Sequence, residues 1–182
     1  MIPTRMSNTD FRRSLYLHPN ESSHIMPRLS RSILKTPLGI CVVEADTKSV
    51  LRVYHTQGPK VETNSSQLTE RCTQQLREYF AGTRKTFDLP LDLSAGTAFQ
   101  NRVWKQLLRI PYGETRTYKQ VASEMGVQAY RAVGSACGAN PLQIVVPCHR
   151  VVSTSGLGGY ANGLEAKRLL LKIENTPIAF KA

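Results

Sequence analysis

The spacing of apolar and polar positions along the chain changes at about residue 37. Ile40 and Val42 precede the polar residues 46–48, and residues 50–54 form a second β-branched and aromatic run. Two such runs around a polar turn predict a β-hairpin. Residues 1–32 hold no sustained apolar period and contain several prolines, so we expect a flexible basic tail there.

Beyond the hairpin, apolar residues recur every three or four positions, which predicts helices. Each of these stretches is followed by a Gly or Pro that breaks the pattern. Cys72 lies on the first apolar stripe and is therefore expected to be a core thiol. The predicted helices cover about 68–80, 97–110, 117–125 and 128–138.

The last third of the chain predicts a strand, a loop and a helix. The apolar run 144–146 predicts a buried strand that ends at Pro147. A glycine-rich loop follows over residues 153–163. Asn162 and Glu165 have the spacing of a capping pair, which predicts the start of a final helix.

This order of elements predicts two folded units after the tail of residues 1–32. We expect an N-terminal α/β domain over 33–92 and a mostly helical C-terminal domain over 97–178. The two short helices around Gly126 resemble a helix-turn-helix. On this pattern alone they could equally serve only the core, because most helix pairs bind no DNA.

Positive charge is concentrated in the C-terminal half. The 182 residues include 24 Lys and Arg against 13 Asp and Glu, a net charge of +11. Residues 97–182 carry eleven of the basic and four of the acidic side chains, whereas residues 36–96 are neutral overall. A basic domain favours a polyanionic partner such as nucleic acid, and a solvated charged face is the equal alternative.

The four cysteines, Cys41, Cys72, Cys137 and Cys148, form no C-x-x-C pair and follow no signal-peptide core. This favours a reducing compartment over a disulfide-bonded secreted protein. No zinc-ligand spacing is present, so no metal is expected. No stretch approaches the ~18 apolar residues of a membrane span, so we expect a soluble protein without a membrane partner.

The segment with the strongest chemical content is Cys148-His149-Arg150, directly after the apolar run. A cysteine beside a histidine and an arginine is a place where a thiolate could be stabilised. Neighbours in sequence can face opposite sides, however, so adjacency alone does not establish contact. From the residues alone, Cys148 is equally a structural thiol or a nucleophile.

The motif Pro147-Cys148-His149-Arg150-Val151 resembles the active-site motif of the O6-alkylguanine-DNA alkyltransferases, the methylated-DNA–protein-cysteine methyltransferases. Further matches follow in order along most of residues 97–174, and residues 36–39 resemble the family's opening strand. These matches are Phe99-Gln100, Val103-Trp104, Leu107, residues 110–115, Tyr118, residues 131–134, Asn140-Pro141, Gly159-Tyr160, Gly163-Leu164, Lys167 and Glu174.

The resemblance implies an α/β (α+β) fold, with a small RNase-H-like N-terminal sheet and a helical C-terminal domain. It implies DNA repair by irreversible, single-turnover transfer of the alkyl group of O6-alkylguanine, and of O4-alkylthymine, to Cys148. No cofactor is implied. The implied partner is duplex DNA, bound by a monomer in a bacterial cytoplasm or a eukaryotic nucleus.

The resemblance also implies how the thiol is activated. A free thiol with a pKa of about 8.5 is mostly protonated at neutral pH. His149 is implied to take the proton through a water molecule, while Glu174 orients His149. From the residues alone, Glu174 reads as a solvated acid at a helix end, and His149 equally as a core histidine.

Other positions of the implied site concern the leaving base. Tyr118 is implied to assist the guanine oxygen, Lys167 to lie near the thiol, and Asn140 to bond the main chain around it. The implied substrate pocket is lined by Tyr160, Ala161 and Pro147.

The implied DNA contacts follow from base extrusion. Arg131 would fill the space left by the base, and Tyr118 would crowd the 3′ phosphate. Small residues would let the recognition helix enter the minor groove, namely Ala132, Gly134 and Ser135. Phosphates would be reached by Gln100, Lys119 and Thr154.

The chain departs from the family pattern at three places. Tyr130 stands where a small residue is common, the turn before the recognition helix is one residue short, and Ala161 stands where many relatives have Ser. Two rival hypotheses remain. The non-reacting alkyltransferase-like class replaces the cysteine, and a sequence-reading helix-turn-helix protein would need neither Cys148-His149 nor Glu174.

Overall fold

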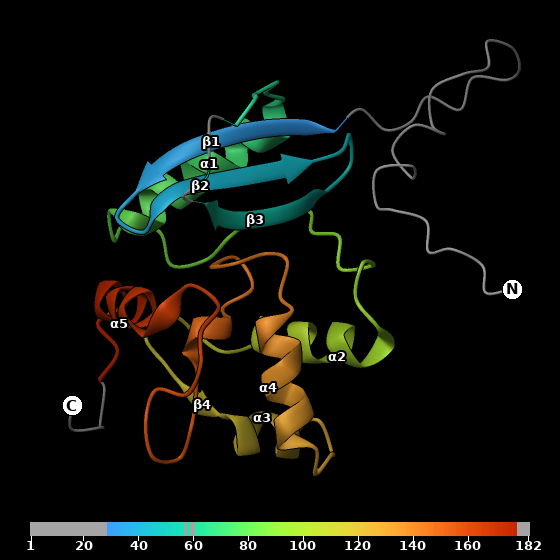
Figure 1. The fold of residues 1–182 in the computed structure, drawn as a ribbon, viewed down its shortest axis with the longest axis vertical. Helices are drawn as coiled ribbons and strands as arrows, with labels where there is room; N and C mark the ends of the chain where they lie inside the picture. The colour runs from blue at the N-terminus through green and yellow to red at the C-terminus, as the bar shows by residue number, and fades with distance from the viewer. Residues whose placement is uncertain (1–28, 57, 59–60, 178–182) are drawn as a thin grey trace, which may run out of the picture.

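The computed structural model describes residues 29–56, 58 and 61–177, and its N-terminal part is a three-stranded antiparallel sheet (Figure 1). The strands are β1 (Ser30–Thr36), β2 (Gly39–Ala45) and β3 (Val50–Thr56), in the order β1-β2-β3. The β-branched Val42 and Val43 of the central strand are fully buried. The predicted hairpin is confirmed as β2 and β3.

Helix α1 (Gln67–Phe80) packs on this sheet (Figure 1). Ser66 caps its first turn, because the Ser66 hydroxyl accepts a hydrogen bond from the Thr69 N–H and the Thr69 hydroxyl accepts one from the Ser66 N–H. The chain leaves the helix through Gly82, whose φ of 74° favours glycine. The first predicted helix is confirmed.

The C-terminal part is mainly helical (Figure 1). The predicted helices over 97–110, 117–125 and 128–138 are confirmed as helices, with shorter bounds. No helix of the described residues is long and apolar enough to cross a bilayer. The elements are α2 (Ala98–Leu107), β4 (Arg116–Thr117), α3 (Tyr118–Glu124), α4 (Tyr130–Gly138), the 3-10 turn η2 (Cys148–Arg150), β5 (Val151–Val152) and α5 (Gly163–Ile173).

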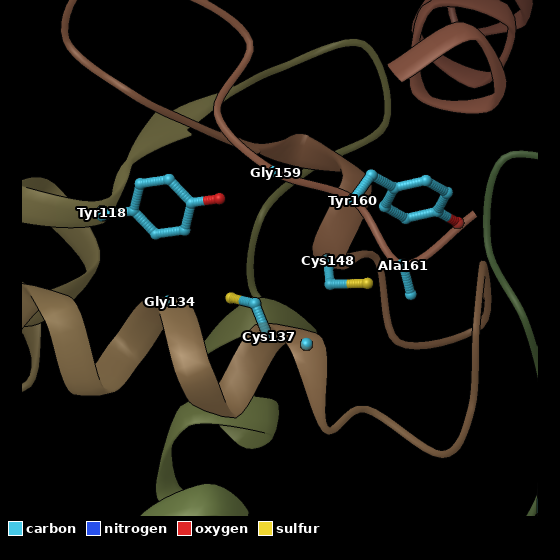
Figure 2. Close-up of a pocket in the computed structure, with 8 residues that line it drawn as sticks. Tyr118, Gly134, Cys137, Cys148, Gly159, Tyr160 and Ala161 are labelled. Carbon is cyan, nitrogen blue, oxygen red and sulfur yellow. The ribbon is translucent and has the colours of Figure 1, made fainter. Parts of the chain in front are cut away.

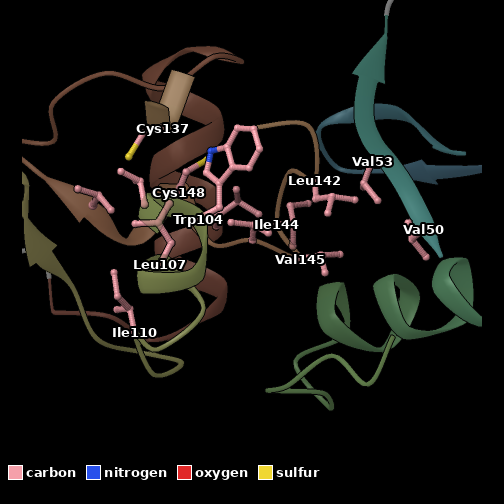
Figure 3. Packing of buried hydrophobic residues seen from close by; sticks show 14 of the residues in the cluster. Val50, Val53, Trp104, Leu107, Ile110, Cys137, Leu142, Ile144, Val145 and Cys148 are labelled. Carbon is pink, nitrogen blue, oxygen red and sulfur yellow. The ribbon is translucent and has the colours of Figure 1, made fainter. Parts of the chain in front are cut away.

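A continuous apolar core joins the two parts (Figure 3). Trp104 lies at the centre of the helical part, and its indole N–H donates to the carbonyl of Ala136 at 2.8 Å, which ties α2 to α4. Val53 of the sheet exchanges backbone hydrogen bonds with Pro141 and Gln143 at 2.9 Å each. The segment after α4 is therefore fixed to the edge of the N-terminal sheet.

The prediction of a strand at residues 144–146 is wrong. The run is a buried turn, with Ile144 at φ 71°. Its side chains are apolar because it is enclosed between the sheet and the helices (Figure 3), and burial alone does not distinguish a strand from a turn.

Three smaller expectations need correction. Asn162 makes no side-chain cap at α5; its amide donates to Gln143 Oε1 at 2.8 Å, and Glu165 pairs with Arg168 instead. Residues 36–39 do not form one opening strand: Thr36 ends β1, residues 37 and 38 form the turn, and Gly39 begins β2. Most of the predicted tail lies outside the described residues, but residues 30–32 belong to β1.

Candidate active site

Cys148 opens the 3-10 turn η2 and borders a cavity of about 250 Å³. The thiol side chain is 6% exposed, so only its face toward the cavity meets solvent. Apart from two tyrosines, the residues around it are small (Figure 2). The lining consists of Tyr118, Gly134, Cys137, Gly138, Cys148, Gly159, Tyr160 and Ala161.

Asn140 fixes the backbone around this thiol, as the resemblance implies. Its amide Nδ2 donates to the Val146 carbonyl at 2.8 Å and to Cys148 Sγ at 3.2 Å. Its Oδ1 accepts from the Leu142 N–H at 3.0 Å. One buried side chain therefore holds both ends of the turn that carries Cys148 and contacts the sulfur itself.

His149 lies beside Glu174 although the two residues are 25 positions apart. His149 is completely buried, and its Nε2 lies 2.7 Å from Glu174 Oε1. The structure brings the histidine and the carboxylate together, and Glu174 is not a solvated acid at a helix end, because it is 2% exposed.

Sequence reasoning missed three further partners of Glu174. Arg150 donates to both carboxylate oxygens, at 2.9 and 3.0 Å. The Tyr79 hydroxyl, from α1, donates to Oε1 at 2.7 Å, and the Gly113 N–H donates to Oε2 at 3.1 Å. Arg150 thus binds the carboxylate of Glu174. Its position in the sequence, two residues after Cys148, had suggested that it stabilises the thiolate.

The protonation states of this cluster follow from burial and hydrogen bonding. Burial raises the pKa of the Cys148 thiol, against the opposite effects of Asn140 and Lys167. Burial lowers the pKa of His149 and outweighs the effect of Glu174. Burial opposes ionisation of Glu174, but its bonds to His149 and Arg150 prevail and lower its pKa to about 2.

At neutral pH the resting site therefore holds a protonated thiol, a neutral imidazole and an ionised carboxylate. The carboxylate can only accept hydrogen bonds, so the proton of the neutral ring lies on Nε2, facing Glu174. The basic nitrogen is then Nδ1 of His149, which has no hydrogen-bond partner among the described residues. The site therefore provides a base, Nδ1 of His149, that is held in orientation by Glu174 and follows Cys148 directly in the chain.

Lys167 is also completely buried. Its ammonium donates to the carbonyls of Val151, Leu157 and Gly159, which ties the glycine-rich loop to the base of the site. Burial lowers its pKa to about 8, while the thiols of Cys148 and Cys137 act to raise it. Lys167 is therefore a positive charge close to both cysteines, as well as the loop's anchor.

Tyr118 forms one wall of the cavity, with its ring between α4 and the glycine-rich loop (Figure 2). A Cβ on Gly158 would lie 2.8 Å from the ring and 2.9 Å from the hydroxyl. Gly158 also has φ 71°, a backbone conformation that favours glycine. The loop is shaped to let Tyr118 occupy this wall.

The structure separates the residues expected to line the substrate pocket. Tyr160 and Ala161 line the cavity with Cys148, but Pro147 does not. Pro147 borders a separate cavity of about 430 Å³, together with Arg150 and other residues, because a tight turn directs neighbouring side chains to different sides. Sequence reasoning missed Cys137 as a lining residue.

Five of the eight residues expected to contact DNA are exposed, whereas Gln100, Tyr118 and Gly134 are half-buried. Arg131, Ala132 and Ser135 are exposed on α4, Lys119 is exposed on α3, and Thr154 is exposed in the glycine-rich loop.

Gln100 on α2 and Tyr130 on α4 make contacts within the protein. The Gln100 side chain is engaged at the start of α2, where its Oε1 accepts from the Thr97 N–H at 2.8 Å. Tyr130 is 42% exposed, and the ammonium of Lys119 lies 5.8 Å from its ring centroid.

Two family models match the chain, and together they span both parts of the fold. "6-O-methylguanine DNA methyltransferase, ribonuclease-like domain" matches residues 29–93. "6-O-methylguanine DNA methyltransferase, DNA binding domain" matches residues 98–176. The first agrees with the expected RNase-H-like sheet, so the predicted fold class is confirmed.

Individual relatives cover most of the chain. The methylated-DNA–protein-cysteine methyltransferase of Methanosarcina barkeri is 42% identical over 150 residues, which are 78% of this chain and 94% of the relative. The constitutive enzyme of Bacillus subtilis is 45% identical over 77% of this chain and 92% of the relative. A crystal structure of Mycobacterium tuberculosis OGT in complex with DNA matches with a TM-score of 0.71 and 42% identity, over 80% of this chain and 93% of that one.

Proposed function

The chain belongs to the O6-methylguanine DNA methyltransferase family, and from that premise we propose that it repairs DNA by transferring the alkyl group of O6-alkylguanine to Cys148. The observation that carries the proposal is the thiol itself. Cys148 is the cysteine of the matched motif, borders a cavity, and is followed by a histidine locked to a buried carboxylate. The acceptor is part of the protein and is not regenerated, so each molecule reacts once.

Activation of the thiol is coupled to His149. Because burial raises the pKa of Cys148, the thiol must lose its proton as the alkyl carbon approaches. Nδ1 of His149 accepts that proton through a water molecule, and the resulting imidazolium is stabilised by Glu174 2.7 Å from Nε2. The nearby charge of Lys167 and the amide of Asn140 stabilise the thiolate.

The leaving base occupies the cavity bordered by Tyr118. As the bond from O6 to the alkyl carbon breaks, negative charge develops on the guanine oxygen and requires a donor. The Tyr118 hydroxyl is the proposed donor. Burial raises the pKa of this hydroxyl, which keeps it protonated at neutral pH. The small residues of the lining leave room for a purine.

DNA binding and base extrusion are assigned to α3 and α4. The exposed cations Arg131 and Lys119 supply phosphate affinity and, for Arg131, a side chain that fills the gap left by the base. Such contacts carry little sequence information, which suits a repair protein that must act anywhere in DNA. We also propose that O4-alkylthymine is a substrate and that the protein acts as a monomer.

The mass of the intact protein tests the transfer. After incubation with an excess of an O6-methylguanine duplex, we expect one added methyl group per molecule, on the peptide that contains Cys148. Cys148→Ala should still bind the duplex and gain no mass. More than one methyl group removed from DNA per protein molecule would contradict the proposal.

A second experiment separates extrusion from binding. Arg131→Ala should lower the repair rate of a duplex lesion by about tenfold or more, because extrusion costs a few kcal/mol. Reaction with free O6-alkylguanine, which needs no extrusion, should stay near the wild-type rate. Arg168→Ala removes one exposed charge from α5 and is the matched control for electrostatic affinity. If Arg131→Ala loses both activities equally, the assignment of Arg131 is wrong.

A further inference from the structure

Another cavity, which we call the α3–α4 cavity, lies between α3 and the start of α4. Its volume is about 380 Å³. The two helices pack against each other at the end of the helical part that lies away from the sheet (Figure 1). The transfer of an alkyl group to Cys148 does not use this cavity. Its lining consists of Lys119, Ala122, Ser123, Val127, Gln128 and Tyr130.

Tyr130 and Lys119 give the α3–α4 cavity an aromatic wall beside a positive charge. Tyr130 is the first residue of α4, directly before Arg131, and its side chain is 42% exposed. Lys119 is exposed on α3, and its ammonium lies 5.8 Å from the centroid of the Tyr130 ring. This distance is within the range of a cation–π contact. The ring and the cation therefore border the same cavity from two helices.

The remaining lining suits a nucleotide. Ala122 and Val127 contribute apolar surface, while Ser123 and Gln128 are exposed and can hydrogen-bond to the edge of a base. The lining contains no acidic residue that would repel a phosphate. Ala129 makes no side-chain cap at the start of α4, so the positive end of the helix dipole adds to the attraction for an anion. Aromatic stacking together with a positive charge is how proteins hold unstacked nucleotides.

Helix geometry relates the α3–α4 cavity to the cavity at Cys148. Tyr118 and Lys119 are consecutive on α3, and each lines one of the two cavities. Gly134 and Tyr130 are one turn apart on α4 and do the same, because a Cβ on Gly134 would lie 3.7 Å from the Tyr118 ring. Four helical residues span about 6 Å, and a DNA strand advances about 3.4 Å per nucleotide. The two cavities are therefore one or two nucleotides apart along a strand.

We propose that the α3–α4 cavity is a subsite for one nucleotide of the damaged duplex, one or two positions from the O6-alkylguanine, with its phosphate at Lys119 and its base stacked on Tyr130. The proposal rests on the proposed transfer to Cys148 and on DNA binding through α3 and α4. Extrusion of the damaged base removes a stacking partner from its neighbours. Tyr130 replaces part of that lost stacking and so lowers the cost of extrusion.

Salt titrations separate the two contacts. The Cys148→Ala protein is the parent for all binding measurements, because it cannot react with an O6-methylguanine duplex. Adding Tyr130→Ala should raise the Kd by about tenfold at every salt concentration, because stacking on an aromatic ring releases no counterions. Adding Lys119→Ala should reduce the slope of log Kd against log salt concentration by about one, which corresponds to one phosphate. Tyr130→Phe keeps the ring and should bind like the parent.

A scan with abasic residues locates the bound nucleotide. Each nucleotide within two positions of the lesion, in either strand, is replaced in turn by an abasic residue, which keeps the phosphate and lacks the base. At one position the parent should lose its tenfold advantage over Tyr130→Ala, because the ring then has no base to stack on. Tyr54→Ala removes a tyrosine beside Arg52 on the sheet and is the matched control, which should behave like the parent throughout.

Two results would overturn the subsite. One is a Tyr130→Ala protein that binds the intact duplex as tightly as the parent. The other is a tenfold difference between the two proteins that persists at every abasic position, because Tyr130 would then act without contacting a base.

Reactions of proteins that retain Cys148 separate this proposal from the proposed function. Free O6-methylguanine requires no DNA contact, so Tyr130→Ala should react with it at the wild-type rate, which also shows that the variant is folded. With the duplex at low protein concentration, Tyr130→Ala should react about tenfold more slowly. Absence of methyl transfer in the wild type would refute the proposed function, whereas equal duplex rates for wild type and Tyr130→Ala would refute only the subsite.

Discussion

Each part of the fold buries a glutamate next to arginine, but the surroundings of the two differ. Glu44, on β2, is 4% exposed and pairs with Arg31 and Arg52, whose side chains are 30% and 56% exposed. Glu174, after α5, is 2% exposed, and its partners His149 and Arg150 are 0% and 7% exposed. The first network opens to solvent, and the second is enclosed on all sides.

The difference in solvent exposure of the partners distinguishes an ion pair that only supports the fold from one that also takes part in the chemistry of the site. Around Glu44, water can replace either arginine at small cost. Around Glu174, the loss of one partner leaves another buried group uncompensated. The enclosed network includes His149, the residue after Cys148. The negative charge of Glu174 therefore determines which nitrogen of the His149 ring is basic. A buried carboxylate is thus informative about function when its partners are buried as well.

The largest effect that would sharpen this comparison is expected for Glu174→Gln. We expect the free energy of unfolding to fall by about 3 kcal/mol, because Arg150 loses its charged partner. Transfer at neutral pH should slow by about 100-fold and recover partly in alkaline buffer, because the neutral amide supports the imidazolium less well. Urea unfolding and single-turnover rates with an O6-methylguanine duplex measure the two effects.

Glu44→Gln is the matched control for that substitution. It also neutralises a buried carboxylate, but its arginines remain solvated, so unfolding should change by about 1 kcal/mol or less and the transfer rate should not change. Equal transfer rates for wild type and Glu174→Gln across the pH range would show that the enclosed network has no part in the chemistry.

The acid stability of the protein should also depend on Glu174. Its pKa falls from 4.5 to about 2 in the folded state, so ionised Glu174 stabilises the fold fully above pH of about 4.5. That contribution, about 3 kcal/mol, is lost as the pH falls from about 4.5 toward 2. Unfolding measured over this range should therefore show a steeper loss in the wild type than in Glu174→Gln. Parallel pH profiles for the two proteins would contradict the assignment.

A smaller effect tests whether the two parts of the fold are functionally separate. Tyr79 extends from α1 and donates to Glu174, so Tyr79→Phe should destabilise the protein by about 1.5 kcal/mol and slow transfer a few-fold. Tyr112→Phe is the control, because the Tyr112 hydroxyl donates to the Ile173 carbonyl and not to the carboxylate. If the two variants slow transfer equally, Tyr79 does not act through Glu174.

The sequence predicts the helices of this fold better than its edge strand β1. The helices follow from apolar residues at a period that only one face of a helix produces. Strand β1 escapes detection because one of its inward positions is Ser32, which is 3% exposed and donates to the hydroxyl of Thr69 at 2.8 Å. A polar residue that is satisfied inside the protein breaks the alternation on which strand prediction depends.

For the site, the sequence identifies the cysteine and its family but not the network behind them. Tyr79 and Glu174 are 95 positions apart, so no local pattern connects them. A signal does exist, since a tyrosine on a buried apolar stripe needs a partner for its hydroxyl. Arg150 carries a similar signal, because a buried arginine must pair with a carboxylate or with carbonyl groups.

Gly158 has a consequence for the range of sequences that this site tolerates. A side chain at that position would meet Tyr118 at 2.8 Å and would have to adopt φ 71°. At Gly159 a Cβ meets no heavy atom within 4 Å. In a library randomised at both positions and selected for survival of alkylation damage, position 158 should return glycine almost alone, while alanine should be recovered at 159. The loop therefore contains two adjacent glycines of which only Gly158 is required by the structure, whereas position 159 accepts other residues.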